Sequence, residues 1–218
     1  GGRERLELSV ELSAQVASLS RRHGVSEYMT LLAAFAVVLW RYSGQSDIAV
    51  GTVLGGRDRA EFEELIGLFV NTMAVRLAVA GETRFEDLLL QVREEVLEGQ
   101  RHGRVPFERV VEAVEPERSL RHAPLVQVMF LYEGQRFDHG RLRLGAVACE
   151  GLEVETATTK FDVTLAVSRT GDRLSAMWEY SLALWEPSTA RRMLEAWERV
   201  VGSAVAEPSR RLRDLDWV

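Results

Sequence analysis

The stretch RYSGQSDIAVGT, residues 41–52, contains the junction between a predicted helix and a predicted strand. Residues 26–43 carry apolar side chains on nearly every side, which is typical of a helix buried all round. Gly44 is expected to end this helix, because glycine readily adopts the left-handed conformation found at helix C-termini. Residues 47–53 place β-branched side chains at alternate positions and predict a strand, and residues 54–59 form a loop with two adjacent glycines. A core helix, a strand and a glycine-rich loop therefore follow one another directly.

The rest of the chain alternates helices and strands and then becomes rich in strands. Leu6, Leu8 and Val10 alternate with polar residues as in a half-buried strand, and Ser13 is expected to cap a helix that ends at Gly24. Further helices are predicted at 83–102, 106–114 and 187–206, a helical turn at 62–66, and strands at 70–79, 125–132, 141–149, 152–158, 160–167 and 173–180. This order predicts one α/β unit, a mixed β-sheet with helices packed on one side.

The helix predicted at 83–102 has a specific start signal. Thr83 and Glu86 have the spacing of a capping box, in which each side chain binds the other's backbone N–H. The helix is expected to end near His102 and Gly103, and Pro106 suits the first turn of the next helix.

Composition excludes several classes of partner. The chain has 218 residues, 46% of them apolar and 28% charged, which is typical of a globular protein with a substantial core. Its net charge of −6 argues against a nucleic-acid partner. The longest uncharged apolar run, residues 28–40, is shorter than the about 20 residues of a membrane span, so we expect no membrane segment. The single Cys149 favours a reducing, cytoplasmic setting.

Common catalytic and metal-binding motifs are missing from the sequence. No histidine is spaced from another, or from Cys149, as metal ligands are, so we expect no metal. The sequence also lacks a G-x-S-x-G elbow, a P-loop and a dinucleotide-binding G-x-G-x-x-G. His102 falls at a predicted helix C-terminus, where positive charge is favourable, and is interpreted as structural.

Asn71 is the most informative polar residue. Its carboxamide lies at the start of a predicted strand, after a turn that contains glycine. There it can donate toward a carbonyl oxygen in a reaction centre, or it can make a strand-edge hydrogen bond. Both interpretations stay open from the residues alone.

Several motifs together resemble the condensation domains of nonribosomal peptide synthetases. They occur in the family's order and span nearly the whole chain: RYSGQSDIAVGT with GGR at 55–57, LIGLFVNTMAVR at 65–76, HGRVPFERVVEAV at 102–114, RHAPLVQVMF at 121–130, TKFDVTLAV at 159–167 and LALWEPSTARRMLEAW at 182–197. The resemblance implies a chloramphenicol acetyltransferase-like fold of two lobes with the active site in a tunnel between them.

The resemblance also implies that only one lobe is present. The family's HHxxxDG motif, whose second histidine serves the chemistry, belongs to the first lobe, and no adjacent pair of histidines occurs here. Residues 1–218 are therefore interpreted as the C-terminal lobe, which also fits the start at Gly1-Gly2 without a methionine. Within it, the resemblance places the floor loop of the tunnel at about 52–59 and the latch, or crossover to the other lobe, at about 132–159.

The same resemblance implies substrate-positioning residues but no catalytic residue in this chain. They are Gly51, Thr52, Gly55, Gly56, Arg57, Asn71 and Gln127. The expected partners are the N-terminal lobe, peptidyl or aminoacyl carrier proteins and an adjacent adenylation domain. No cofactor is expected to bind directly, because the phosphopantetheine arms belong to the carrier proteins.

The expected function is amide-bond formation between two carrier-bound thioesters, within the biosynthesis of a peptide such as an antibiotic. The isolated chain is expected to be inactive because the general base is missing. Two alternatives stay open: a non-catalytic docking or recruitment domain, and an ester-forming acyltransferase of the same fold. The residues preceding Gly1 would discriminate among them.

Overall fold

A computed structural model describes residues 1–55, 60–62, 64–114, 123–134, 143–145, 147–148 and 158–218. The described strands are β1 (Gly2–Glu7), β2 (Asp47–Gly55), β3 (Val70–Ala78), β4 (Val128–Glu133), β5 (Arg143–Leu144), β6 (Val147–Ala148), β7 (Val163–Thr170) and β8 (Arg173–Tyr180). The helices are α1 (Val10–His23), α2 (Glu27–Ser43), α3 (Phe85–Arg101), α4 (Phe107–Val114) and α5 (Pro187–Ala206), with 3-10 turns at Ala60–Phe62 and Leu212–Asp214.

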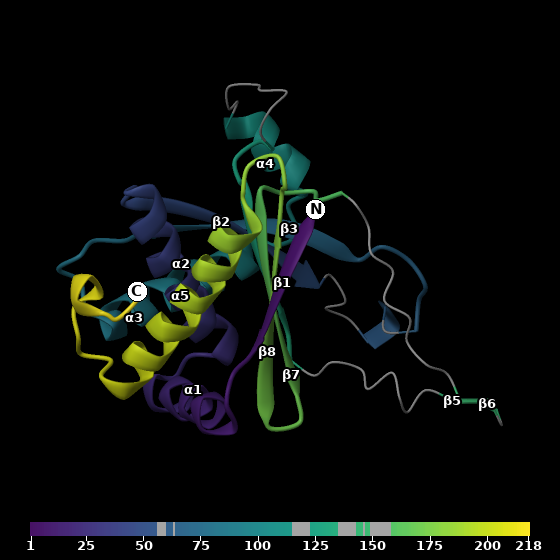
Figure 1. The fold of residues 1–218 in the computed structure, drawn as a ribbon. Coiled ribbons are helices and arrows are strands. Elements are labelled where there is room, and N and C mark those ends of the chain that lie inside the picture. Colours follow the sequence, from purple (N-terminus) through teal and green to yellow (C-terminus); the bar gives the residue numbers. More distant parts are fainter. Residues whose placement is uncertain (56–59, 63, 115–122, 135–142, 146, 149–157) are drawn as a thin grey trace.

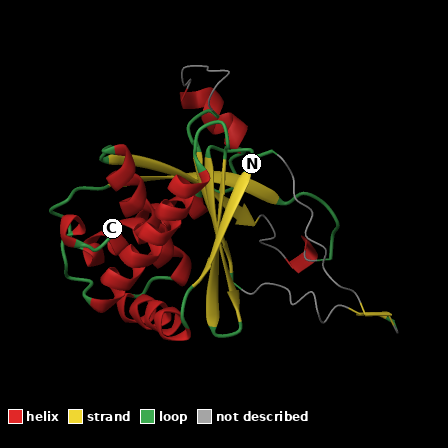
Figure 2. Ribbon diagram, in the orientation of Figure 1, coloured by secondary structure: helices red, strands yellow, loops and turns green. Residues whose placement is uncertain are grey.

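Six strands form a mixed sheet in the order β1-β8-β7-β4-β2-β3. The pairs β2–β4 and β4–β7 are parallel and the others antiparallel. Helices α1, α2, α3 and α5 cover one face of this sheet (Figures 1 and 2). The short pair β5–β6 forms a separate sheet that lies away from the helices (Figure 1). The predicted mixed sheet with helices on one side is confirmed.

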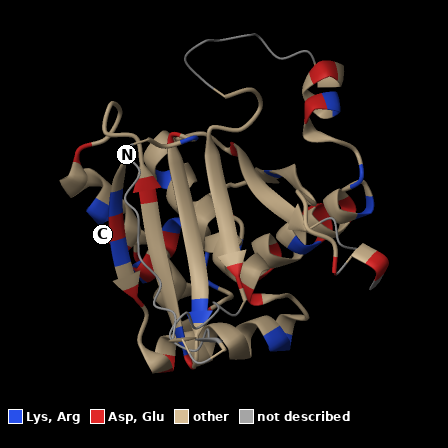
Figure 3. Cartoon of the chain, turned by 90° about the vertical axis from the view of Figure 1, so that its right-hand side faces the viewer, with Lys and Arg blue, Asp and Glu red and all other residues tan. Residues whose placement is uncertain are grey.

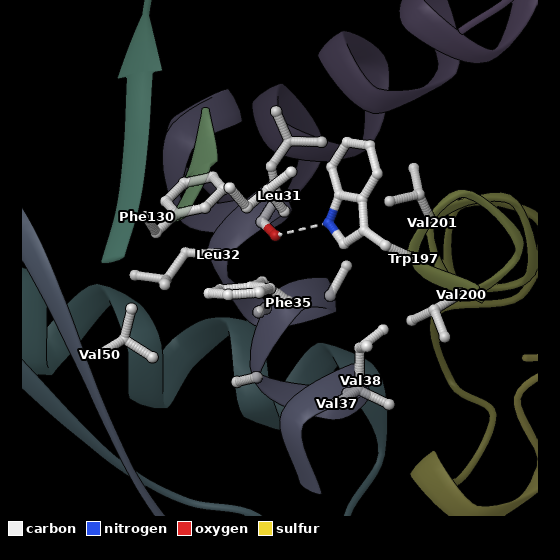
Figure 4. Packing of buried hydrophobic residues seen from close by; sticks show 14 of the residues in the cluster. Leu31, Leu32, Phe35, Val37, Val38, Val50, Phe130, Trp197, Val200 and Val201 are labelled. Atoms are coloured by element: carbon white, nitrogen blue, oxygen red, sulfur yellow. Dashed lines mark hydrogen bonds between the residues drawn. The ribbon is translucent and has the colours of Figure 1, made fainter. Parts of the chain in front are cut away.

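Helix α2 is the centre of the core. Every residue of the run 29–38 is buried, as its apolar composition predicts. Phe35 stacks on Phe130 with ring centroids 5.9 Å apart and meets the edge of Trp178 at 5.6 Å. From α5, the indole N–H of Trp197 donates to the carbonyl of Leu31 at 3.4 Å (Figure 4). The side chains of α2 thus join β4, β8 and α5 in one apolar cluster.

The prediction that residues 28–40 form a core helix is confirmed by this burial. No single helix among the described residues has both the length and the apolar character needed to cross a bilayer. Within the described part of the chain, α1 and α2 taken together meet those two criteria, but a bend of 104° separates them.

The helix boundaries confirm some capping predictions and correct others. Gly24 and Gly44 end α1 and α2 with φ of 63° and 70°, as predicted. The predicted cap at Ser13 is wrong: α1 begins at Val10, and the hydroxyl of Ser9 accepts the N–H of Leu12 at 3.1 Å. Ser13 is instead fully buried and accepts the N–H of Leu174 at 3.0 Å. Two serines four residues apart offer the same local signal, and only the fold distinguishes them, because Ser13 faces β8.

The predicted capping box of α3 is also wrong. Arg84, not Thr83, is the N-cap residue, and its side chain makes no capping hydrogen bond. The N–H groups of Phe85 and Glu86 donate instead to the carbonyls of Arg210 and Pro208, at 3.1 and 2.9 Å. A segment more than 120 residues away in the chain therefore satisfies the helix N-terminus, which no local pattern can reveal.

Most remaining elements follow the predictions. Helix α5 has the predicted bounds, β7 and β8 lie within three residues of theirs, and α4 begins directly after Pro106. The turn predicted at 62–66 occurs earlier, at Ala60–Phe62. Within the strand predicted at 141–149, the described residues contain β5 and β6, and residues 141–142, 146 and 149 lie outside the described residues, as do residues 152–157 of the next prediction.

Candidate functional site

Gly51 and Thr52 lie at the seam between β2 and β4. The two strands pair through Gly51 opposite Met129. The Thr52 hydroxyl donates to the carbonyl of Phe130 at 2.9 Å and is buried. This side-chain hydrogen bond ties the two strands together.

Gly51 is required at this seam by space. A Cβ on Gly51 would overlap the sulfur of Met129 and lie 3.0 Å from Cγ2 of Val126. The missing side chain therefore lets β2 approach β4 closely. The structure assigns Gly51 and Thr52 a packing role at the sheet centre, and the prediction that they line a substrate tunnel stays a prediction.

The other residues predicted near the loop are more dispersed. Gly55 ends β2 and is exposed, while Gly56 and Arg57 lie outside the described residues. Gln127 directly precedes β4. Its side-chain amide donates to the carbonyl of Ala123 at 2.9 Å, and its backbone carbonyl accepts the N–H of Asp162 at 3.0 Å. Gln127 thus holds the entry to β4.

Asn71 connects β3 to the turn between α3 and α4. Its Nδ2 donates to the carbonyls of Gly103 and Val105 at 2.9 and 2.7 Å. Its Oδ1 accepts the N–H of Phe107 at 3.1 Å, at the first residue of α4, and also the N–H of Thr72 at 2.9 Å. The carboxamide uses both hydrogens and both lone pairs on backbone groups. The structure therefore places Asn71 as a clamp on residues 103–107.

His102 ends α3 and is exposed. Its Nε2 lies 3.2 Å from Glu98, one turn earlier on the same helix. Hydrogen bonds from Arg101 and His102 lower the pKa of the Glu98 carboxyl. This arrangement agrees with the structural interpretation of His102.

A cluster of polar side chains that the sequence analysis missed joins Glu27, Tyr132 and Arg169. The Tyr132 hydroxyl donates to Oε2 of Glu27 at 2.7 Å, and the Arg169 guanidinium donates to the same oxygen at 2.8 and 3.0 Å. Burial, followed by the bond to Glu27, raises the pKa of Tyr132 to about 12. The cluster ties the ends of β4 and β7 to the start of α2. No sequence spacing signals it, because its members lie 105 and 142 residues apart from Glu27.

The face of the sheet opposite the helices is uncovered by any described helix and carries few charges along its central strands (Figure 3). On β7, partly exposed Thr164, Ala166 and Ser168 alternate with buried apolar residues. On β8, partly exposed Ser175 and Met177 do the same. These positions of β7 and β8 carry uncharged side chains, while Glu179 continues the same alternation on β8 and pairs with Arg3 of β1 at 2.9 Å.

Residues 64–70, which end on the first residue of β3, expose a run of large apolar side chains. Ile66 is fully exposed, at 104% of its reference area, and Leu68 is 90% exposed. Leu65 and Val70 are about half exposed. The segment extends away from α1, α2 and α5 (Figure 1). Contiguous exposed apolar surface of this kind marks a contact site.

The described residues contain no group of three or more His, Cys, Asp or Glu side chains that could hold a metal ion. Among these residues, the side chains of Thr52, Asn71 and Gln127 each donate a hydrogen bond to a backbone carbonyl.

Comparison with known proteins identifies the family. The condensation domain model matches residues 1–218. The chain belongs to the condensation domain family. A subunit of the linear gramicidin synthase of Brevibacillus parabrevis is 40% identical over 211 residues, which are 95% of this chain and 4% of that protein. The chain thus spans a small part of the curated relatives it matches.

Solved structures share the fold of this condensation domain chain. A four-domain nonribosomal peptide synthetase, holo-AB3403 bound to AMP and glycine, matches with a TM-score of 0.92 and 23% identity, over 100% of this chain and 18% of that one. The complex of the X-domain and OxyB from teicoplanin biosynthesis matches with a TM-score of 0.89 and 25% identity, over 100% of this chain and 48% of that one. The predicted chloramphenicol acetyltransferase-like fold of the condensation domains is confirmed.

Proposed function

We propose that this chain is the C-terminal lobe of a nonribosomal peptide synthetase condensation domain that joins two carrier-bound aminoacyl or peptidyl thioesters through an amide bond. Membership of the family and 40% identity to part of a linear gramicidin synthase support the reaction class. The match to 48% of the chain from the X-domain complex supports the single-lobe assignment. A peptide antibiotic as the product and a cytoplasmic location belong to the same proposal.

In the proposed reaction, the amine of the acceptor attacks the thioester carbonyl of the donor. A C–N bond forms, the C–S bond breaks, and the donor's carrier-bound thiol leaves with a proton while the amine gives one up. The phosphopantetheine thiols belong to the carrier proteins. A general base is needed near the amine, and the family's adjacent histidine pair is missing from this chain.

The contribution of this lobe is positioning. We assign the tunnel floor to about 52–59, directly after the seam where Gly51 and Thr52 fix β2 against β4. Asn71 and Gln127 act through the backbone segments that they hold. We assign the latch to about 132–159, which begins at Tyr132. Correct placement of two reactants contributes several kcal/mol to catalysis in enzymes of many kinds.

The exposed apolar segment at 64–70 is the observation that carries the two-lobe assignment. A soluble monomer rarely leaves Ile66 and Leu68 exposed side by side with half-exposed Leu65 and Val70. These side chains follow the proposed floor loop along the chain. We propose that the N-terminal lobe of the same domain covers these side chains.

A condensation assay with two defined carrier-bound thioesters tests the proposal. The protein extended to include the preceding lobe is expected to form the amide, and the chain of 218 residues alone is expected to form none. The matched control is the extended protein with the second histidine of its HHxxxDG motif changed to alanine. Turnover by the isolated chain would refute the single-lobe assignment, and turnover with hydroxyl acceptors in place of amines would favour the ester-forming alternative.

A second candidate function is a non-catalytic docking domain. It is favoured by the likeness to the X-domain, whose solved structure is a complex with OxyB. An extended protein that binds a tailoring enzyme with micromolar or tighter affinity, but gives no amide with any thioester pair, would support docking over catalysis. Amide formation at a rate that depends on the HHxxxDG histidine would exclude it.

A further inference from the structure

The C-terminal tail, residues 207–218, turns back from α5 and lies across the start of α3 and the end of α2. Figure 1 shows the C-terminus beside these two helices. Four backbone hydrogen bonds join the tail to residues 81–86. Phe85 and Glu86 donate to the carbonyls of Arg210 and Pro208, at 3.1 and 2.9 Å. In return, Leu212 and Arg213 donate to the carbonyls of Thr83 and Gly81, at 2.8 and 3.1 Å.

These bonds resemble the addition of a peptide strand to a protein groove. Arg84 and Arg211 form an antiparallel β-bridge at its centre. Main-chain bonds on both sides of that bridge give affinity, while side-chain pockets give specificity in peptide recognition of this kind. The tail satisfies two of the N–H groups that every helix N-terminus leaves without an intrahelical partner.

Three apolar side chains of the tail fill the groove or lie against its rim. Leu212 is fully buried and Leu215 is 3% exposed. Trp217 meets the edge of the Tyr42 ring at 5.8 Å. The spacing of these anchors, Leu-x-x-Leu-x-Trp, defines the tail as a short recognition motif.

Arg41 fastens the tail from the side of α2. Its guanidinium donates to the carbonyl of Leu212 at 3.0 Å and to the carbonyl of Arg213. The same guanidinium lies 4.7 Å from the Trp40 ring and 5.4 Å from the Trp217 ring. Glu82 adds ion pairs with Arg211 and Arg213. Arg211 and Arg213 therefore share a partner in the groove, while Arg210 bonds to Glu207 and Asp216 of the tail and to Ser203 of α5.

We propose that residues Trp40–Tyr42 and 81–86 form a peptide-binding groove whose ligand is the tail, residues 208–217, and that the docked tail orders the first turn of α3. The tail is then a separable ligand held in cis rather than a continuation of α5. This inference does not depend on catalysis by the domain.

The test uses the full chain with a protease site inserted between Ala206 and Glu207. After cleavage without denaturant, the tail is expected to co-elute with the body in size-exclusion chromatography, as mass spectrometry of the peak would show. Hydrogen exchange at Phe85 and Glu86 is expected to be the same before and after cleavage. Loss of the unaltered tail from the body on cleavage would overturn the proposal.

Matched variants separate the groove from the general fold. After cleavage, Trp217→Ala and Leu212→Ser are expected to release the tail and to speed exchange at Phe85 and Glu86 about fivefold, the effect of losing a typical N-cap. Leu184→Ser, at a site 54% exposed and outside the groove, is the control and is expected to keep the tail bound. If the Leu212→Ser chain does not fold, exchange at Phe85 and Glu86 is measured in the uncleaved Trp217→Ala chain instead. Exchange at Phe85 and Glu86 that stays slow after the tail has left would also contradict the proposal.

Discussion

The helix-covered side of the sheet and the segment at 64–70 are built in opposite ways. On the helix-covered side, Phe35, Trp178 and Trp197 are fully buried. Together they belong to one continuous apolar core. At 64–70, Ile66 and Leu68 are almost fully exposed. The first region provides the buried core of the fold, and the second supports the proposal that another lobe covers this part of the chain.

The largest expected effect is on the helix-covered side. Phe35→Ala removes the stacking on Phe130 and the edge contact with Trp178 and leaves a cavity beside α2. We expect the free energy of unfolding to fall by about 3–5 kcal/mol. Urea denaturation followed by circular dichroism measures it. A loss below about 1 kcal/mol would mean that the core is not centred on α2.

Asn71 directly follows the segment at 64–70 along the chain, and its substitution is expected to show an intermediate effect. Asn71→Ala leaves the carbonyls of Gly103 and Val105 and the N–H of Phe107 without their partner. We expect a loss of about 1–3 kcal/mol in unfolding free energy and faster exchange of the Phe107 amide hydrogen. Asn71→Asp keeps the acceptor but turns an oxygen toward two carbonyls, so it should be no better than alanine. Full stability in either variant would show that the clamp contributes nothing to the fold.

The seam at Gly51 offers a matched pair of glycines on one strand. Gly51→Ala forces Met129 and Val126 to move, and we expect a loss of about 1–3 kcal/mol from overpacking. Gly55→Ala meets no described heavy atom within 4 Å and is the control. Thermal unfolding of both variants gives the comparison. Equal midpoints would remove the spatial reason for a glycine at residue 51.

Tyr132 is expected to show the smallest effect, and its effect depends on pH. Its pKa in the folded state, about 12, lies above the usual value of 10. The folded state therefore keeps a proton that the unfolded state loses, so this contribution is fully present below pH 10 and disappears as the pH rises toward 12. The stability difference between the wild type and Tyr132→Phe should narrow between pH 9 and 11.5. A constant difference in urea midpoint between the wild type and Tyr132→Phe over that range would contradict the raised pKa of Tyr132.

The fold could be predicted from the sequence where the signal is local. Apolar residues on all sides of 26–43 predicted α2, glycine predicted both helix ends, and Pro187 with the pattern after it predicted α5 to the residue. The predictions failed where a distant segment decides the outcome. Ser13 bonds to β8 rather than to its own helix, and α3 is capped by Pro208 and Arg210 rather than by Thr83.

The candidate site was predictable in part for the same reason. The motif around Asn71 singled out this residue, but its three backbone partners at 103–107 lie in the turn after α3 and at the start of α4. The cluster of Glu27, Tyr132 and Arg169 had no signal at all, because ordinary residue types meet there only in the folded chain. The exposure of Ile66 could not be read from sequence either, since an apolar run predicts burial.

Hydrogen exchange at residues 64–70 tests the two-lobe account most directly. The measurement compares this chain alone with the protein extended to include the preceding part of the condensation domain, and the amide hydrogens of α2 serve as the internal reference. The account predicts that exchange at Ile66 and Leu68 slows at least tenfold in the longer protein, a protection of about 1.4 kcal/mol, while α2 stays unchanged. Equal exchange of the segment in both proteins would contradict the claim that another lobe covers it.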